Sequence, residues 1–169
     1  MNIRELDGKL IMPKTGRMLS LTPYQEEIIE NLMNTSQNIY YRTRMGNSTA
    51  LIYYFIMMLK NKENYKICYV SSDIATSDKT RFDFEKYLQY NLKYINDNYY
   101  SEKDSVKFET GSSVTFVTAE QLEDALIGRA SMKSKFDKVI CENYVFSRSV
   151  EADITRFFNQ DIQYLLENS

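Results

Sequence analysis

Short apolar segments alternate with longer segments of helical character along most of this sequence. Strand-like runs are expected at residues 37–42, 66–71 and 138–142. Helices are expected at residues 22–33, 48–60, 77–95, 119–127 and, as a closing amphipathic helix, within 147–169. Strands that alternate with helices predict an α/β fold in which helices flank a mainly parallel central sheet in three layers.

Two further segments lie outside this alternation of strands and helices. Residues 106–108 and 114–117 flank a Gly-Ser-Ser turn and predict a hairpin. Residues 1–20 lack clean periodicity, contain Pro13 and Gly16, and are expected to form an arm or a lead-in strand. With 169 residues and no internal repeat or linker, the sequence predicts one domain over residues 1–169.

The sequence contains no histidine. This excludes Ser-His-Asp and Cys-His catalysis and every metal site that needs an imidazole ligand. The two cysteines, Cys68 and Cys141, lie within apolar runs and cannot form a structural zinc site alone. We expect them to be buried free thiols in a reducing compartment, with a disulfide as the alternative.

The balance of charge argues against a protein that grips nucleic acid non-specifically. There are 21 Lys and Arg against 23 Asp and Glu, and the isoelectric point is about 5.3. Any contact with nucleic acid is therefore expected to be local, weak or shared with a partner. The longest apolar stretch, residues 50–59, is too short to cross a bilayer. The start of the sequence lacks the apolar core of a signal peptide, so a cytoplasmic protein with no membrane contact is expected.

A phosphate-binding loop is indicated where the first strand runs into an apolar helix, at residues 42–49. Such a loop needs a glycine that lets the backbone wrap phosphate, amide donors at a helix start, and a hydroxyl for Mg²⁺. Gly46, Ser48 and Thr49 fit these needs, but Asn47 stands where a lysine is expected. The alternative is an ordinary turn.

A second motif lies at residues 137–143, where an apolar strand ends in acidic and polar residues. A nucleotide-hydrolysing site needs an aspartate at such a strand end to hold Mg²⁺ and a glutamate to orient the attacking water. Cys141 occupies the first position and Glu142 the second. The alternative is a buried strand that ends at a solvated glutamate.

The order of these segments resembles the ATPase domain of the large terminase, the DNA-packaging motor of tailed phages. The resemblance spans residues 21–146. The matching segments are Thr22-Pro23-Tyr24-Gln25, the loop at Gly46, Gly111-Ser112-Ser113-Val114, Asp124-Ala125-Leu126-Ile127-Gly128 and Val139-Ile140-Cys141-Glu142. The resemblance implies a three-layer P-loop NTPase fold of the RecA/ASCE type. The sequence ends at Ser169, so we expect no nuclease domain like that of the full-length motor.

The resemblance also implies roles for individual residues. ATP and Mg²⁺ are the implied cofactors, and Ser48 is the implied magnesium ligand. Glu142 matches the catalytic carboxylate and Thr118 the segment that couples hydrolysis to motion. The implied nucleotide contacts are Tyr24 and Gln25 for adenine, Arg42 or Arg44 as the loop arginine, and Gly46, Asn47, Ser48 and Thr49 for the phosphates.

Two substitutions predict that nucleotide binding is weak or lost. Asn47 offers a neutral hydrogen bond in place of a charge-assisted one worth about 1.5–3 kcal/mol. Loss of such a pre-organised donor slows a reaction by roughly 10²–10³. A buried thiol at Cys141 is a poor ligand for a hard cation. The sequence therefore predicts a degenerate ATPase.

The first functional hypothesis is a non-catalytic binding or regulatory protein with a viral or host protein partner. Its 14 tyrosines fit a contact surface and include three adjacent pairs: Tyr40-Tyr41, Tyr53-Tyr54 and Tyr99-Tyr100. The alternative is that these tyrosines are half-buried in strands and helices and have a structural role.

The second hypothesis is an ATP-binding or ATP-hydrolysing subunit of a DNA-packaging or other nucleic-acid motor, in which another chain supplies the missing groups. A third is direct nucleic-acid binding through the basic segment 129–138. The alternative for that segment is a solvated face.

Overall fold

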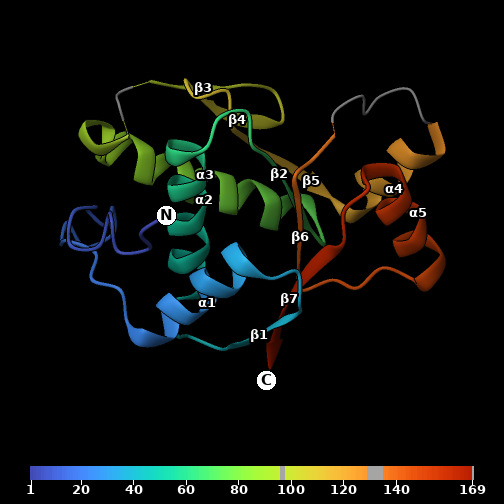
Figure 1. Ribbon diagram of the computed structural model, residues 1–169, viewed down its shortest axis with the longest axis horizontal. Helices are drawn as coiled ribbons and strands as arrows, with labels where there is room; N and C mark the ends of the chain where they lie inside the picture. Colours follow the sequence, from blue (N-terminus) through green and yellow to red (C-terminus); the bar gives the residue numbers. More distant parts are fainter. Residues whose placement is uncertain (96–97, 129–134, 169) are drawn as a thin grey trace.

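The computed structural model describes residues 1–95, 98–128 and 135–168. Helices and strands alternate along the chain and form one layered body (Figure 1). In chain order the elements are α1 (Pro23–Asn34), β1 (Ile39–Arg42), α2 (Asn47–Asn61), β2 (Lys66–Ser71), α3 (Ile74–Tyr90), the 3-10 helix η1 (Leu92–Tyr94), β3 (Tyr99–Ser101), β4 (Ser105–Phe108), β5 (Ser113–Thr118), α4 (Ala119–Gly128), β6 (Lys138–Glu142), α5 (Arg148–Phe158) and β7 (Ile162–Asn168).

All seven strands belong to one sheet with the order β1-β7-β6-β2-β5-β4-β3. The five strands from β1 to β5 in this order run parallel to one another, and β4 and β3 continue the sheet antiparallel. Because parallel strands end at a common edge, the residues that follow β1, β2, β6 and β7 are brought together there. The α/β class, the mainly parallel sheet and the flanking helices are as the sequence predicts.

Two apolar cores lie on the two faces of the sheet. One core is formed by α1, α2 and α3, which lie together on one side in Figure 1. The other is formed by α4 and α5, which lie on the opposite side. Successive side chains of a strand alternate between these cores: Ile67 and Tyr69 belong to the first, Cys68 and Val70 to the second.

Helix α2 is the centre of the first core. Every side chain from Ala50 to Leu59 is buried, so this helix has no solvated face. Phe55 makes edge-on ring contacts with Tyr69, Phe84 and Phe116, which join α2 to β2, α3 and β5. Such a helix places its amino end firmly at the edge of the sheet, where the candidate site lies.

The chain after residue 147 differs from the single closing helix that its apolar residues predict. Helix α5 begins at Arg148, capped by Ser147, and ends where Asn159 adopts a left-handed conformation with φ of 53°. The following residues form β7, which pairs with both β1 and β6. The prediction of a helix over 147–169 is therefore wrong for its second half. A short segment after a turn with apolar residues at 162 and 164–166 suits a buried strand because both faces of this sheet are covered.

The first 20 residues are a packed segment and not a free arm. Leu6, Leu10 and Leu19 are buried against α2 and its neighbours. The hydroxyl of Tyr53 accepts a hydrogen bond from the backbone N–H of Leu6 (3.1 Å) and donates to the carbonyl of Ile3 (2.5 Å). Two other elements depart from the predictions: α3 begins earlier, at Ile74 with Asp73 as its cap, and β3 extends the hairpin of β4 and β5.

Both cysteines are buried and free, as the sequence predicts. The tyrosine pairs do not form a common surface. Tyr41, Tyr53 and Tyr54 are fully buried, whereas Tyr40 and Tyr100 are exposed. Within the described residues, no helix combines the length and the apolar character that a membrane crossing requires.

Candidate nucleotide site at the edge of the sheet

A cavity of about 330 Å³ lies where α2 begins and β6 ends. Ser48 of α2 and Glu142 of β6 line it together, although they lie far apart in the sequence. Helix α3 contributes Lys79 and Thr80 to the same cavity, and Glu167 comes from β7. The structure thus brings the phosphate-loop candidate and the carboxylate candidate to one place.

The turn at Gly46 has a conformation that needs glycine. Its φ is 77°, in the left-handed region that L side chains rarely adopt. A Cβ atom at this position would lie 2.3 Å from Nε2 of Gln25. That Nε2 donates a 3.2 Å hydrogen bond to the carbonyl of Gly46, and Gln25 also completes a capping box with Thr22. The side chain of Gln25 therefore holds the turn through its hydrogen bond to Gly46, and Gln25 is itself buried.

Asn47 does not reach into the cavity. Its Nδ2 donates a 2.7 Å hydrogen bond to the carbonyl of Arg42, and only 8% of the residue is exposed. Its Oδ1 is buried and has no hydrogen-bond donor within the described part of the chain. The side chain joins the end of β1 to the start of α2. Because its amide is neutral, it also supplies no positive charge where a lysine would meet the phosphates.

The other residues predicted to touch nucleotide surround the loop without lining the cavity. The hydroxyl of Tyr24 accepts a 2.7 Å hydrogen bond from the backbone N–H of Arg42. Arg42 and Arg44 are exposed, and Arg44 has a φ of 61°. Thr49 is half-buried beside Ser48 and lines a neighbouring cleft.

Cys141 and Glu142 point to opposite faces of the sheet. Cys141 is fully buried in the core of α4 and α5, and its thiol contacts the carbonyl of Tyr144 at 3.2 Å. Glu142 faces the α2 side, lines the cavity and accepts a 2.5 Å hydrogen bond from the hydroxyl of Tyr69. The prediction that Cys141 stands in the place of a magnesium-anchoring acid does not agree with this geometry. Glu142 is the first acidic side chain of β6 to face the loop, and Asn143 follows it in the cavity wall.

Burial raises the pKa of Glu142 above its ordinary value. The hydrogen bond from Tyr69 acts in the opposite direction because it stabilises the carboxylate, and the charge of Glu167 raises the pKa further. Burial also raises the pKa of the Cys141 thiol to about 12, so this group is neutral at physiological pH.

Thr118 lies outside the cavity. Its hydroxyl accepts a hydrogen bond from the N–H of Gln121 (3.1 Å), and the Gln121 side chain accepts one from the N–H of Thr118 (3.0 Å). This reciprocal pair caps the start of α4. Thr118 is buried and lines a different cleft beside Phe116 and Arg81.

The charges around the cavity oppose a nucleotide triphosphate. Among the described residues that line it, Lys79 is the one cation, and Asp83, Glu142 and Glu167 are acidic. The Nζ of Lys79 is already paired with Asp83 at 2.9 Å. No cluster of three acidic or thiol side chains suited to a metal ion occurs within the described ranges. The excess of carboxylates over cations in this lining therefore fits a triphosphate poorly.

One lysine of the basic segment 129–138, Lys138, is buried in the protein. Lys138 is 8% exposed and its Nζ donates to the carbonyls of Leu32 (2.8 Å) and Thr35 (2.9 Å), at the end of α1. Burial lowers the pKa of Lys138 to about 8. Lys135 is exposed, and residues 129–134 lie outside the described residues.

Solved structures with a similar arrangement of helices and strands include phage large terminases. The HK97 bacteriophage large terminase superposes with a TM-score of 0.70 at 12% identity over 98% of this chain. The fold is that of a terminase ATPase domain. The ATPase domain of the Thermus phage P74-26 large terminase superposes with a TM-score of 0.58 at 10% identity over 88% of this chain.

The terminase fold is shared with a helicase. The UvsW helicase of bacteriophage T4 superposes with a TM-score of 0.67 at 16% identity over 99% of this chain. This chain spans 36% of the HK97 protein, 65% of the P74-26 domain and 59% of the helicase. No protein-family model matches the sequence. No curated protein matches it either.

Several residues that line this cavity are not indicated by the sequence patterns. Lys79, Thr80 and Asp83 belong to α3, and the apolar pattern that predicts this helix says nothing of its polar side chains. Glu167 lies in the predicted closing helix, whereas in the structure it is near the end of strand β7. The signal available for β7 is the Asn-Gln-Asp group at residues 159–161, which breaks a helix before a short apolar run.

Proposed function

We propose that this chain is a terminase-like P-loop domain that does not hydrolyse nucleotide efficiently and acts by binding a protein partner, viral or host. The observation that carries the proposal is the place of Asn47, whose side chain is turned back onto the carbonyl of Arg42. A hydrolysing site needs positive charge at the transferred phosphate during the reaction. Here the neighbouring carboxylates of Glu142, Glu167 and Asp83 outnumber Lys79.

The arrangement of Ser48 and Glu142 supports descent from a nucleotide site. Ser48 at the start of α2 and Glu142 at the end of β6 line one cavity, and Gly46 adopts a left-handed conformation just before α2. Local sequence alone does not require these features to meet. We infer that the shape of the site was kept while its charge changed.

Exposed apolar side chains on α4 and α5 support a protein partner. Ile127 is 82% exposed and Phe157 is 40% exposed, and both line a shallow hollow with Leu126. A single exposed apolar residue needs no explanation, but neighbouring ones on two helices suit a contact surface. This surface lies on the opposite side of the sheet from α2 and α3 (Figure 1).

Calorimetric titration with Mg-ATP, paired with a phosphate-release assay, tests the loss of hydrolysis. We expect little or no binding and no turnover above background. A turnover of about 1 s⁻¹, at the low end for ordinary enzymes, that Glu142→Gln abolishes would overturn the proposal. The same assay with the Asn47→Lys variant separates the missing charge from the rest of the site.

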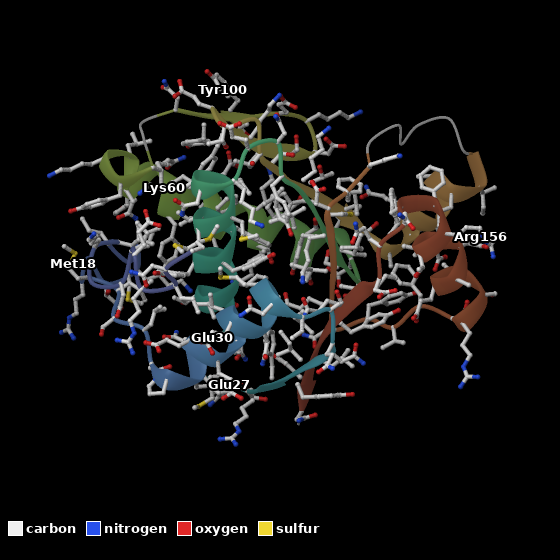
Figure 2. All side chains as sticks on the ribbon, viewed as in Figure 1. Met18, Glu27, Glu30, Lys60, Tyr100 and Arg156 are labelled. Carbon is white, nitrogen blue, oxygen red and sulfur yellow. The ribbon has the colours of Figure 1, made fainter. Side chains whose placement is uncertain are left out.

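The partner is tested by cross-linking in cells that carry the chain, with Ile127→Ser and Phe157→Ser as surface variants. Tyr100→Ser is the matched control, because Tyr100 is 53% exposed on β3, well apart from α5 and its Arg156 (Figure 2). We expect a cross-linked protein with the native chain and the control, and its loss with both surface variants. Recovery of no partner counts against this part of the proposal.

The second candidate function is a subunit of a nucleic-acid motor whose missing groups come from another chain. The shared fold of terminases and the UvsW helicase favours it. Hydrolysis that appears only with a partner and DNA supports this candidate. No hydrolysis under any of these conditions removes it.

A further inference from the structure

A cleft of about 360 Å³ lies between the N-terminal segment and the outer side of α3. Residues 12–14 form one wall and α3 forms the other. Ser48 and Thr49, at the start of α2, belong to the same lining, so the cleft adjoins the acidic cavity and shares Ser48 with it. A ligand bound here therefore lies along α3 and the N-terminal segment and ends next to the loop before α2.

The α3 wall of the cleft carries exposed aromatic rings. Phe82, Lys86 and Tyr90 follow one another at intervals of four residues and so lie along one stripe of the helix. Phe82 is 60% exposed and Tyr90 is 50% exposed, so neither ring belongs to the core. The Nζ of Lys86 lies 5.3 Å from the centre of the Phe82 ring. Large rings and long cationic side chains that neighbour one another on one helix are typical of protein–protein contact surfaces.

The less exposed part of the lining is largely apolar. Ile52 and Tyr87 are buried, and Met12 and Pro13 are half-buried beside them in the same cleft. An apolar hollow that exposed rings surround suits one large apolar side chain of a partner, as at the centre of many interfaces. A protein supplies such a side chain, whereas a wholly polar ligand leaves this part of the cleft unfilled.

The rim of the cleft is positively charged. Lys79 is paired with Asp83 at 2.9 Å, so these two charges offset each other. Lys14 and Lys86 also line the cleft, and neither takes part in an ion pair among the described residues. The chain as a whole has a net charge of -2. This local excess of cations favours a partner segment that carries carboxylates.

Hydrogen bonds fix the wall that the N-terminal segment forms. The N–H of Met12 donates to the carbonyl of Arg17, and the N–H of Gly16 donates to the carbonyl of Met12, both at 2.8 Å. The buried side chain of Asn91, just after α3, accepts from the N–H of Ile11 (2.6 Å) and donates to its carbonyl (2.9 Å). The cleft is therefore preformed, which lowers the entropy cost of binding.

We propose that this cleft binds an acidic segment of a partner protein. One apolar side chain of that segment packs on Phe82 and Tyr90, and its carboxylates pair with Lys14 and Lys86. The proposal rests on the proposed function in that the ligand is a protein. It adds a second contact surface, because α3 and the hollow on α4 and α5 lie on opposite sides of the sheet (Figure 1).

The test is the selection of twelve-residue peptides from a random displayed library on the full chain. Peptides that also bind the double variant Phe82→Ser with Lys86→Gln are discarded. We expect the remaining peptides to combine several acidic residues with an aromatic or large aliphatic one. The most enriched peptide is then synthesised with a fluorescent label, and its affinity is measured by fluorescence anisotropy.

Single variants separate the two parts of the contact. Phe82→Ser is expected to weaken binding of the labelled peptide about tenfold or more, as the loss of an aromatic anchor does. Lys86→Gln is expected to weaken it about threefold, as for one exposed ion pair, and to reduce its dependence on salt. Because both side chains are outside the core, the urea midpoints of these variants should equal that of the native chain.

The matched control copies the pair of side chains outside the cleft. Tyr100 of β3 and Lys107 of β4 lie opposite each other on neighbouring strands, and both are exposed. Tyr100→Ser and Lys107→Gln are expected to leave peptide binding unchanged. Ile127→Ser and Phe157→Ser should also leave it unchanged, so this test and the cross-linking test of the α4 and α5 surface fail independently.

Three results overturn the proposal. One is a selection that yields no peptide whose binding depends on Phe82 and Lys86. Another is a set of selected peptides without acidic residues, because the lysines then play no part. The third is a six-residue oligodeoxythymidylate that binds more tightly than the selected peptide and is weakened by Phe82→Ser, because the cleft then serves nucleic acid and not a protein.

Discussion

The Nδ2 atom of Asn47 donates a 2.7 Å hydrogen bond to the carbonyl oxygen of Arg42. This hydrogen bond joins the start of α2 to the end of β1, and Asn47 is buried. A side chain committed to this contact cannot also reach a phosphate above the loop. The position that holds the lysine of a working loop has thus become part of the scaffold.

Replacing Asn47 by lysine is expected to lower the stability of the fold and to raise its affinity for nucleotide. The variant loses the bond to the Arg42 carbonyl, at a cost of about 1 kcal/mol in the free energy of unfolding. It gains a charge-assisted contact to phosphate worth about 1.5–3 kcal/mol, which tightens nucleotide binding about tenfold or more. Urea denaturation and calorimetry measure the two effects. The control is Asn47→Ala, which loses the bond and gains no charge; equal affinity in both variants contradicts the prediction.

Replacing Cys141 by aspartate is expected to damage the protein without restoring a metal site. The thiol is fully buried in the core of α4 and α5, and burial raises its pKa to about 12. A carboxylate there would lie among the apolar side chains of this core, and an unpaired buried charge costs about 3–5 kcal/mol. The measurement is the urea midpoint of Cys141→Asp against Cys141→Ser, whose hydroxyl can keep the contact with the Tyr144 carbonyl. A stable aspartate variant that hydrolyses ATP would show that Cys141 faces the site after all.

The carboxyl of Glu142 is expected to make stability depend on pH. Burial raises its pKa above the ordinary value of 4.5, so the folded protein holds this proton more tightly than the unfolded chain. The contribution to the free energy of unfolding is fully present below pH 4.5 and is lost as the pH rises through the folded pKa. Denaturation curves of the native chain and of Glu142→Gln across this range should diverge in that direction. A constant difference between the two would mean that the carboxyl is not buried in solution.

Removal of the Asn91 amide is expected to loosen the N-terminal segment. Asn91→Ala breaks three hydrogen bonds and leaves both peptide groups of Ile11 without their partner. Because an unpaired buried polar group costs about 1–3 kcal/mol, the free energy of unfolding should fall by about 3 kcal/mol. Trypsin should then cut earlier after Lys9 and Lys14. Asn98→Ala, which loses an exposed bond to Glu109, is the matched control and should leave both readouts unchanged.

The local patterns of the sequence account for most elements. The run at 66–71 forms β2, and Thr22 with Gln25 caps α1 as the capping-box pattern indicates. These features depend on side chains a few residues apart, which is why they can be read from the chain. The C-terminal segment is not settled in this way, because its short apolar stretch at residues 164–166 suits a buried helix and a buried strand equally well.

By itself, the sequence determined the α/β class, a glycine at position 46 before an apolar helix, the absence of histidine chemistry and an asparagine, Asn47, where a phosphate loop has lysine. The tertiary structure decided which side chains meet. It placed β7 between β1 and β6, turned Cys141 away from the site and Glu142 towards it, and brought Lys79 and Lys86 of α3 beside the N-terminal segment. Strand order and the face that a residue occupies depend on pairing between distant segments, and no local pattern encodes that pairing.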